Sequence, residues 1–466
     1  MNAELAKLRT EKDAIGQCDL PEDALFGINT FRSVNNFAYV GERLRDYPNY
    51  VSWLIKIKWA AAITNGAHGK ISTSKTDAIV AACKDIVADQ AYEPFVVDML
   101  EGAGGTSINM NINEVLANRA LQLQGKCPGD YHLISPLDDV NHAQSTSDVL
   151  IAAMKLTLHD EIAQLVATLR MYSETFREQE ARFDKILRIG RTCMQDALPV
   201  RVGQAFGGYA ELVDRSASNL EGLQKSLNSL PLGATAIGTG LGAYPGYTDM
   251  VLSILRDFSN QPLVADKNFF DGIQNLDEFA TLSAAVKTTG LAISKIANDF
   301  ILLSSGPVGG LQEIRLEAKQ TGSSMMPGKV NPVFAMGMVQ AAFLVSGLDA
   351  SIAPAVAAGQ LDCNNYLPLI AYSSFKSIKI LNSALNGFHE NCVKTLEVLA
   401  DQCESNLMRS TAVAPALKAR IGYERTAELV NIAHSTGRTL MELVVERGLM
   451  SEGEVFCLLH RACSNK

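Results

Sequence analysis

The feature that most constrains this chain is a stripe of large apolar residues with helical spacing across residues 158–176. Its members follow one another in steps of four and three positions: Leu158, Ile162, Leu165, Leu169, Tyr172 and Phe176. Such steps place every member on one face of a long helix. A helix cannot bury so long a stripe by itself, so this spacing predicts that it packs against other helices in a bundle.

Further patterns typical of helices extend this prediction along the chain, and several of them are rich in alanine. They cover residues 51–100, 277–304, 333–358 and 362–399. Alternating patterns typical of strands are few and short, and residues 11–37 read as an irregular segment. We therefore predict a mainly α protein. A central domain of residues 141–400 holds the bundle, between an N-terminal domain (1–140) and a small helical C-terminal domain (401–466).

Composition limits the partners of such a protein. The chain has 466 residues, 47% of them hydrophobic, and a formal net charge of −9. An acidic chain without a run of Lys and Arg is not expected to bind nucleic acid. The N-terminus lacks the apolar segment of a signal peptide, and from the sequence we expect no apolar run to reach membrane-spanning length. We therefore expect a cytoplasmic protein with no membrane partner.

Cysteine and histidine spacing gives no sign of a metal site. The nine cysteines are scattered and form no C-x-x-C pair, and the seven histidines show no H-E-x-x-H spacing. This usage is typical of reduced thiols in a cytosolic protein. We expect neither a metal nor another cofactor.

The most distinctive polar stretch is residues 322–332, Gly-Ser-Ser-Met-Met-Pro-Gly-Lys-Val-Asn-Pro. Its glycines bend freely and its central proline interrupts any helix, so it is predicted to be a loop. The loop offers two hydroxyls, an ammonium group and an amide, from Ser323, Ser324, Lys329 and Asn331. Such a set can supply an oxygen that removes a proton, beside donors for a carboxylate. The alternative is a flexible Gly/Ser linker, but linkers rarely contain Met-Met-Pro or Lys-Val-Asn-Pro.

Three other stretches place hydroxyl and thiol groups at turns or at predicted helix starts. Thr106 and Ser107 follow a glycine-rich turn at residues 102–105. Ser145, Thr146 and Ser147 come directly before the long apolar stripe, while Thr192 and Cys193 lie in a turn at residues 189–199. Helix N-termini bind anions, although simple helix capping explains the same residues. No nucleotide-binding motif such as G-x-x-x-x-G-K-[ST] is present.

Together these motifs resemble the aspartase/fumarase superfamily in their residues and in their order, from about residue 11 to 458. Its enzymes eliminate a leaving group from a succinate skeleton and release fumarate. The run Thr106-Ser107-Ile108-Asn109 is similar to aspartases, where fumarases usually read Thr-Gln-Ser-Asn. The resemblance implies a carbon–nitrogen lyase of the aspartate ammonia-lyase type, which converts L-aspartate into fumarate and ammonia. It also implies a homotetramer of helical bundles in which each active site draws loops from three chains.

The resemblance further implies a role for each candidate residue. Ser323 is the base that removes the proton. The β-carboxylate is held by Thr106, Ser145, Thr146 and Ser324, and the α-carboxylate by Thr192, Lys329 and Asn331. Ser107, Ser147 and Cys193 complete the predicted substrate-binding set, with Ser147 and Cys193 on the side of the leaving group.

Four positions depart from the pattern of the superfamily. Ser147 replaces a usual Asn, Cys193 a usual His or Gln, Met336 a usual Glu and His142 a usual Lys. Fumarases depend on the His/Glu pair, so these departures argue against a fumarase. They leave open a lyase for another substituted succinate with an N-, S- or O-linked leaving group. A non-catalytic structural bundle is a further alternative, although the retained Ser323, Lys329 and Asn331 argue against it.

Overall fold

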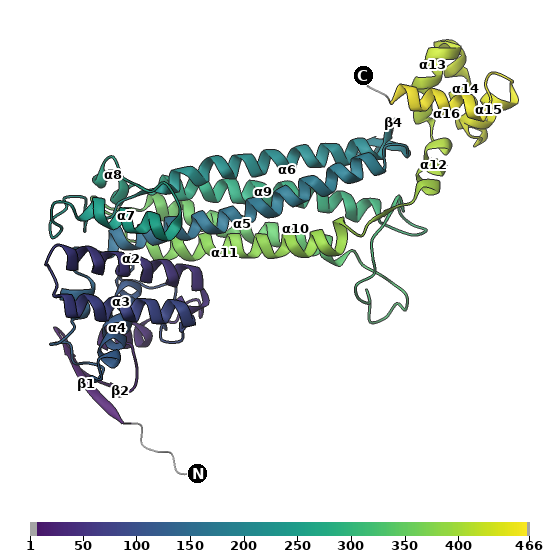
Figure 1. Ribbon diagram of the computed structural model, residues 1–466. Helices are drawn as coiled ribbons and strands as arrows, with labels where there is room; N and C mark the ends of the chain where they lie inside the picture. The colour runs from purple at the N-terminus through teal and green to yellow at the C-terminus, as the bar shows by residue number, and fades with distance from the viewer. Residues whose placement is uncertain (1–6, 464–466) are drawn as a thin grey trace. The chain divides into compact units, whose positions relative to one another are not determined.

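The computed structural model describes residues 7–463 and confirms a mainly α fold (Figure 1). The α-helices are α1 (Ile28–Asn36), α2 (Pro48–Ala67), α3 (Thr73–Asp89), α4 (Thr106–Leu123), α5 (Thr146–Arg182), α6 (Val202–Gln224), α7 (Tyr247–Ser259), α8 (Phe269–Gln274), α9 (Asp277–Leu303), α10 (Val333–Ala357), α11 (Leu367–Phe388), α12 (Ala400–Arg409), α13 (Ala414–Ile421), α14 (Tyr423–Thr436), α15 (Leu440–Glu446) and α16 (Glu452–Ala462). The strands are short and pair two by two: β1 (Leu8–Asp13) with β2 (Gly16–Pro21), β3 (Leu187–Thr192) with β4 (Gln195–Arg201), β5 (Ser229–Leu230) with β6 (Val264–Ala265), and β7 (Ile314–Arg315) with β8 (Glu397–Val398).

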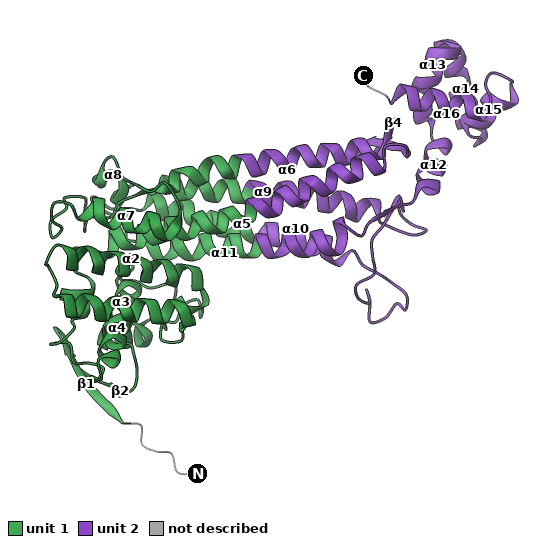
Figure 2. Ribbon diagram, viewed as in Figure 1, with its two compact units in different colours: residues 1–165, 219–287, 344–380 green, residues 166–218, 288–343, 381–466 purple. Residues whose placement is uncertain are grey.

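The chain divides into two compact units (Figure 2). Unit 1 comprises residues 1–165, 219–287 and 344–380, and unit 2 comprises the remaining segments, 166–218, 288–343 and 381–466. The boundaries pass through the five long helices α5, α6, α9, α10 and α11, so each unit contains a part of every one of them. The three-domain division expected from the sequence therefore stays a prediction.

The predicted stripe lies on α5, and all six of its members are buried. In unit 2, the Tyr172 hydroxyl of α5 donates to the Leu385 carbonyl oxygen of α11 at 2.6 Å. In unit 1, the Ser283 hydroxyl of α9 donates to Asp349 of α10 at 2.7 Å. The predicted helix bundle is thus confirmed, and its helices meet through polar contacts as well as apolar ones.

The segment at residues 11–37 is not irregular, as the sequence predicted, because it contains the antiparallel β1–β2 hairpin and helix α1. The start of α1 is held by Glu114 of α4, a fully buried carboxylate. This carboxylate accepts hydrogen bonds from the Thr30 hydroxyl (2.6 Å) and the Gly27 amide (2.8 Å). A side chain at Gly27 would collide with Glu114 and with the Tyr131 hydroxyl. These long-range contacts order a segment whose local pattern is weak.

Helix α10 is more apolar than expected, since by length and composition it could span a membrane. The prediction that no apolar run reaches that length is therefore wrong. Its one charged residue, Asp349, contacts Ser283 and Lys287 of α9, as in a packed bundle. Elsewhere α10 exposes large apolar side chains, with Phe343 62% and Leu344 53% accessible. The helix thus has polar contacts on one side and uncovered apolar surface on another.

Candidate active site

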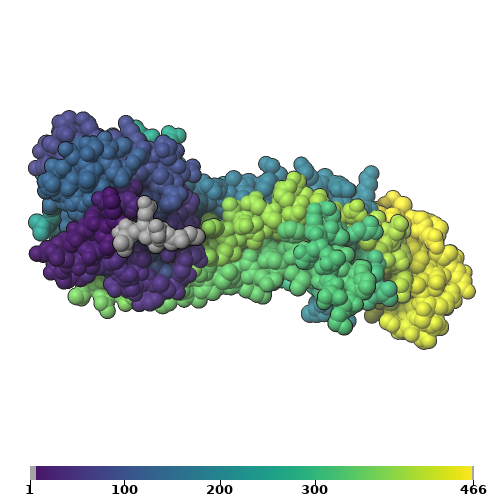
Figure 3. All heavy atoms as spheres, turned by 90° about the horizontal axis from the view of Figure 1, so that it is seen from below, coloured from purple at the N-terminus to yellow at the C-terminus, as the bar shows by residue number. Residues whose placement is uncertain are grey.

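The loop at residues 322–332, called here the signature loop, belongs to unit 2 and precedes α10. Two hydrogen bonds close its ends: the Gly322 amide donates to the Lys329 carbonyl oxygen, and the Asn331 side-chain amide donates to the Gly322 carbonyl oxygen, both at 2.8 Å. Most of the loop is exposed, including Ser324 and Lys329. In Figure 3, the chain that has the green colour of residues near 320 lies on the face turned to the viewer. Hydrogen bonds therefore join the two ends of the loop, and most of its side chains are exposed to solvent.

Ser323 has a distinctive environment within this loop. Its Oγ accepts hydrogen bonds from the backbone amides of Met325 and Met326, each at 3.1 Å. Hydrogen bonds donated to an oxygen favour its anionic form over the neutral hydroxyl. The side chain is half-buried, whereas its neighbour Ser324 is exposed. The loop therefore provides one serine oxygen with two donors already aimed at it.

Thr192 and Cys193 lie at the tip of the β3–β4 hairpin, also in unit 2. Cys193 and Met194 form its two-residue turn with φ values of +50° and +61°, the backbone of a hairpin turn whose twist suits the flanking strands. The strand is anchored behind the tip by Arg191, which donates to the buried carboxylate of Glu313 at 2.6 and 3.1 Å. Thr192 and Cys193 are exposed on this anchored hairpin.

Thr106 and Ser107 open helix α4 in unit 1. The helix starts after Gly105, whose φ of +96° and close approach to Leu150 exclude a side chain. The Glu101 carboxylate accepts hydrogen bonds from the backbone amides of Ala103 and Gly105 in the preceding turn. Burial raises the pKa of Glu101. Thr106 is exposed and Ser107 is buried, so only the first of the two hydroxyls faces solvent.

Ser145, Thr146 and Ser147 lie at the start of α5, and all three are half-buried. The Asn109 side-chain amide, from the first turn of α4, donates to the Thr146 hydroxyl at 3.4 Å. The structure therefore brings together the Thr106–Ser107 and Ser145–Ser147 segments, which are far apart in the sequence. They form one group of hydroxyls within unit 1.

A buried polar network that the sequence analysis did not identify lies behind this group. The Asn141 side-chain oxygen accepts hydrogen bonds from Lys58 Nζ (2.8 Å) and from the side-chain amides of Asn109 and Asn113 (3.1 Å each). Lys58, on α2, is fully buried. Burial lowers the pKa of Lys58 to about 7, although the negative charge of Asp148 opposes this shift. Three donors thus fix the side chain of Asn141.

Asp148, in the first turn of α5, is the acidic member of this network. It is fully buried and accepts hydrogen bonds from the backbone amides of Ser145 (2.9 Å), Thr235 (3.0 Å) and Gly233 (3.3 Å). Burial raises the pKa of Asp148 to about 7. The carboxylate therefore ties the Ser145 segment to the glycine-rich bend at residues 232–240.

Two features of the sequence could have pointed to the buried polar network. Lys58 interrupts an apolar run of α2, and a lysine within such a run either reaches solvent or needs a buried partner. Asn109 and Asn113 are four residues apart and share one face of α4. The sequence did not show that Asn141 is the common acceptor of these three side chains.

The predicted site residues fall into two groups in different units. Thr106, Ser107, Ser145, Thr146 and Ser147 belong to unit 1, while Thr192, Cys193, Ser323, Ser324, Lys329 and Asn331 belong to unit 2. Each group is organised by contacts within its own unit. Within residues 7–463, no cluster of His, Cys, Asp and Glu side chains has the arrangement of a metal site.

Two of the four residues that differ from the superfamily pattern, His142 and Met336, lie outside the buried polar network. His142 Nδ1 hydrogen-bonds the Asp138 carbonyl oxygen at 3.1 Å, and Met336 is exposed in the first turn of α10. Neither side chain contributes a charge-paired contact to the two groups.

Comparisons with known proteins agree over nearly the whole chain. A family described as lyase matches residues 16–347, and the fumarase C C-terminus family matches residues 413–460. An aspartate ammonia-lyase of Pseudomonas fluorescens is 40% identical over 451 residues, which cover 96% of this chain and 94% of that protein. The cobalt-bound fumarate lyase:delta crystallin of Brucella melitensis is 38% identical with a TM-score of 0.94, covering 98% of this chain and 100% of that one. The class II fumarase of Schistosoma mansoni is 30% identical with a TM-score of 0.88, covering 97% and 98%.

Proposed function

Because this chain belongs to the lyase family, within the aspartase/fumarase superfamily that its motifs resemble, we propose that it eliminates ammonia from L-aspartate to give fumarate. The chain is a carbon–nitrogen lyase. Aspartate ammonia-lyase relatives that match 96% of the chain support aspartate as the substrate. The structural observation that carries the proposal is the environment of Ser323.

In this mechanism Ser323 removes a proton from the carbon beside the β-carboxylate of aspartate. A neutral serine is a weak base, so the reaction needs Oγ as an anion and needs that anion to be stabilised before the substrate arrives. The backbone amides of Met325 and Met326, 3.1 Å from Oγ, supply this stabilisation. The electron pair left on carbon moves into the β-carboxylate, which becomes a doubly negative aci-carboxylate. Its collapse expels ammonia from the neighbouring carbon and forms the double bond of fumarate.

Hydroxyl and amide donors stabilise the charge that develops on the β-carboxylate. We assign this role to Thr106, Ser145, Thr146 and Ser324. The buried network supports it in unit 1, because Asn109 fixes the Thr146 hydroxyl and Asp148 fixes the Ser145 backbone. Donors held in place before the reaction cost no reorganisation when charge develops. Thr192, Lys329 and Asn331 hold the α-carboxylate in this assignment.

We further propose that the active protein is a homotetramer with active sites shared between subunits. The division of the predicted residues between unit 1 and unit 2 supports sharing. The exposed apolar surface of α10 supports association, because large apolar patches on soluble proteins mark interfaces. Mixing two inactive variants, Ser323→Ala and Thr146→Val, under conditions of subunit exchange tests this. Regained activity in the mixture supports shared sites, and a mixture as inactive as its parts contradicts them.

The direct test of the reaction is to mix the purified protein with L-aspartate and follow the absorbance of fumarate. Stoichiometric release of ammonia together with fumarate would establish the proposed reaction. Absence of fumarate, in a preparation that is folded and assembled, would contradict it.

A second candidate is a lyase that releases fumarate from another substituted succinate. Cys193 and Ser147 favour it, because a thiol and a single hydroxyl are poorer partners for an ammonium group than an imidazole or an amide. Running the reverse reaction with fumarate and ammonia, amines or thiols identifies the preferred nucleophile. The double change Ser147→Asn and Cys193→His then separates the candidates. It raises activity on aspartate if aspartate is the substrate, and it lowers activity on the other substrate if the pocket is adapted to that leaving group.

A further inference from the structure

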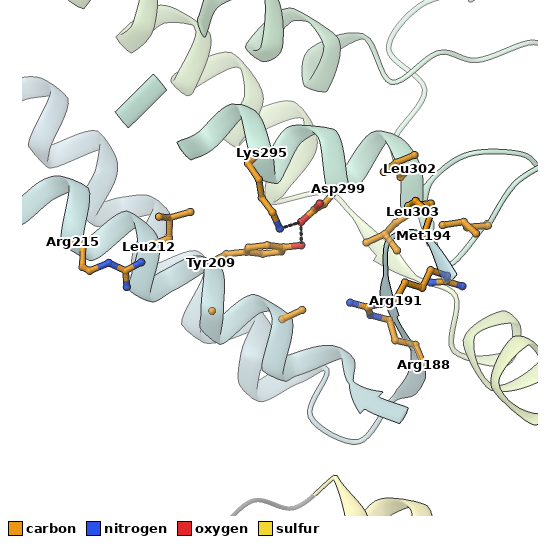
Figure 4. A pocket seen from close by; sticks show the side chains of 13 residues that line it. Arg188, Arg191, Met194, Tyr209, Leu212, Arg215, Lys295, Asp299, Leu302 and Leu303 are labelled. Atoms are coloured by element: carbon orange, nitrogen blue, oxygen red, sulfur yellow. Dashed lines mark hydrogen bonds and ion pairs between the residues drawn. The ribbon is translucent and has the colours of Figure 1, made fainter. Parts of the chain in front are cut away.

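Unit 2 contains a cavity of about 520 Å³ lined by residues of α6, α9 and the β3–β4 hairpin (Figure 4). Small-molecule sites typically have volumes of roughly 300–1,000 Å³. None of the predicted active-site residues lines this cavity, although Met194, next to Cys193, does. The cavity is therefore a separate feature of unit 2 that the proposed reaction does not use.

Four basic side chains line the cavity, and two of them are neutralised within the protein. Arg191 pairs with the buried carboxylate of Glu313. Lys295 pairs with Asp299, which also accepts a hydrogen bond from the Tyr209 hydroxyl at 2.7 Å (Figure 4). These contacts satisfy Asp299, the one acidic side chain of the lining.

The other two basic side chains of the lining are Arg188 and Arg215. Arg188 Nη1 donates to the Ile189 carbonyl oxygen at 2.9 Å, a neutral acceptor. In the described part of the chain, no carboxylate lies within ion-pair distance of Arg188 or Arg215. Figure 4 shows the two on opposite sides of Tyr209.

Figure 4 shows the Tyr209 ring and Leu212 between these two arginines, and Leu302, Leu303 and Leu311 add apolar side chains elsewhere in the lining. An occupant that suits this lining carries negative charge at each end and an apolar body between. We propose that the cavity binds a small organic dianion, with two carboxylate or phosphate groups joined by an apolar spacer. Arg188 binds one anionic end and Arg215 the other, since guanidinium groups pair with either anion through two parallel hydrogen bonds.

Calorimetric titration of the full-length protein with adipate tests the proposal, with butane-1,4-diyl bisphosphate as a second arm. The titrations use the Lys329→Ala protein, so that binding to the proposed catalytic site is weakened. Loss of a charge-assisted hydrogen bond costs roughly 10- to 100-fold in affinity. Arg188→Gln and Arg215→Gln should each weaken binding of the better of the two dianions by that factor, and Arg215→Lys, which keeps the charge but not the second hydrogen bond, should weaken it less than Arg215→Gln. Whichever dianion binds more tightly identifies the preferred anionic group.

Arg182→Gln is the matched control. Arg182 is an exposed arginine of unit 2 that lies outside the cavity, against the ring of Phe183, and its replacement should leave binding unchanged. Arg215 is exposed on α6, so Arg215→Gln tests the site even if Arg188→Gln disturbs the hairpin.

Two results overturn the proposal: no saturable binding of either dianion below about 10 mM, or binding that persists in Arg188→Gln and Arg215→Gln. A protein without lyase activity would still bind the dianion here, so failure of this proposal and failure of the proposed function are distinguishable.

Discussion

The two groups of predicted site residues lie in opposite kinds of surroundings. Those of unit 1 rest on Lys58 and Asp148, both without solvent exposure and both in a network of side-chain and backbone hydrogen bonds. The signature loop of unit 2 is mostly exposed, and a few hydrogen bonds within the loop hold it. The first group therefore lies against a buried network, whereas most of the second group lies on a surface loop.

This difference suggests a division of tasks. Buried groups held by several hydrogen bonds reorient little, which suits them to keep the neighbouring hydroxyls in position for a carboxylate. An exposed loop with few contacts has low local stability and can move as substrate binds, which suits the residues that act directly on the reacting atoms. Changes in the loop should therefore alter catalysis without altering stability, whereas changes in the network should lower stability.

The largest effect is expected for Ser323→Ala in the loop. Removal of a positioned base lowers kcat by roughly 10²-fold or more, while binding of dicarboxylates should remain because the proposed carboxylate contacts lie elsewhere. Steady-state kinetics with aspartate and titration with succinate measure the two quantities. Near-normal turnover would exclude Ser323 as the base.

Lys329→Ala should act mainly on binding. Its ammonium group holds the α-carboxylate in the proposed mechanism, and loss of a charge-assisted hydrogen bond raises KM by roughly 10- to 100-fold. The urea midpoint of unfolding should not change, because Lys329 is exposed. A KM equal to that of the wild type would contradict the assignment.

Lys58→Met tests the contribution of the buried network of unit 1 to stability. The substitution keeps an unbranched side chain but removes a buried donor from Asn141, and such a loss costs about 1–3 kcal/mol of stability. Urea unfolding measures it. Lys329→Met is the matched control, because a surface change is expected to stay within about 0.5 kcal/mol. If the two variants lose equal stability, the proposed difference between core and loop is wrong.

The dependence of stability on pH sharpens the comparison at Asp148. Burial raises the pKa of this carboxyl from 3.8 to about 7. Between about pH 4 and 7 the folded state therefore binds a proton that the unfolded state has released, and the contribution of Asp148 to stability falls as pH rises. Asp148→Asn removes this titration. The unfolding free energy of the wild type relative to the variant should fall by roughly 1–4 kcal/mol from pH 4 to 7 and then level off.

Lys58 gives the opposite dependence, because its pKa is lowered to about 7. Above pH 7 its folded form has released a proton that the unfolded form still binds, so stability relative to Lys58→Met should rise toward pH 10. Differences that do not vary with pH in either variant would show that neither group titrates as its burial implies.

The sequence by itself determined the features that depend on local spacing. The stripe from Leu158 to Phe176 predicted a long packed helix because helix periodicity is fixed by the backbone, and α5 buries all of its members. The glycines and proline of residues 322–332 predicted a loop because they limit the backbone directly, and these residues do form a loop before α10. The family was also recognisable, since its motifs are short and local.

Only the tertiary structure decided what depends on distant partners. Lys58 and Asn141 are 83 positions apart, and no local pattern shows that they share a hydrogen bond. The hairpin and helix in residues 11–37 depend on contacts such as that of Thr30 with Glu114, 84 positions away. The structure also divided the predicted residues between two units, and it placed no carboxylate of residues 7–463 within ion-pair distance of Arg188 or Arg215. A side chain's burial, partners and charge state arise from the packing of distant segments, which the residues on either side of it in the chain do not determine.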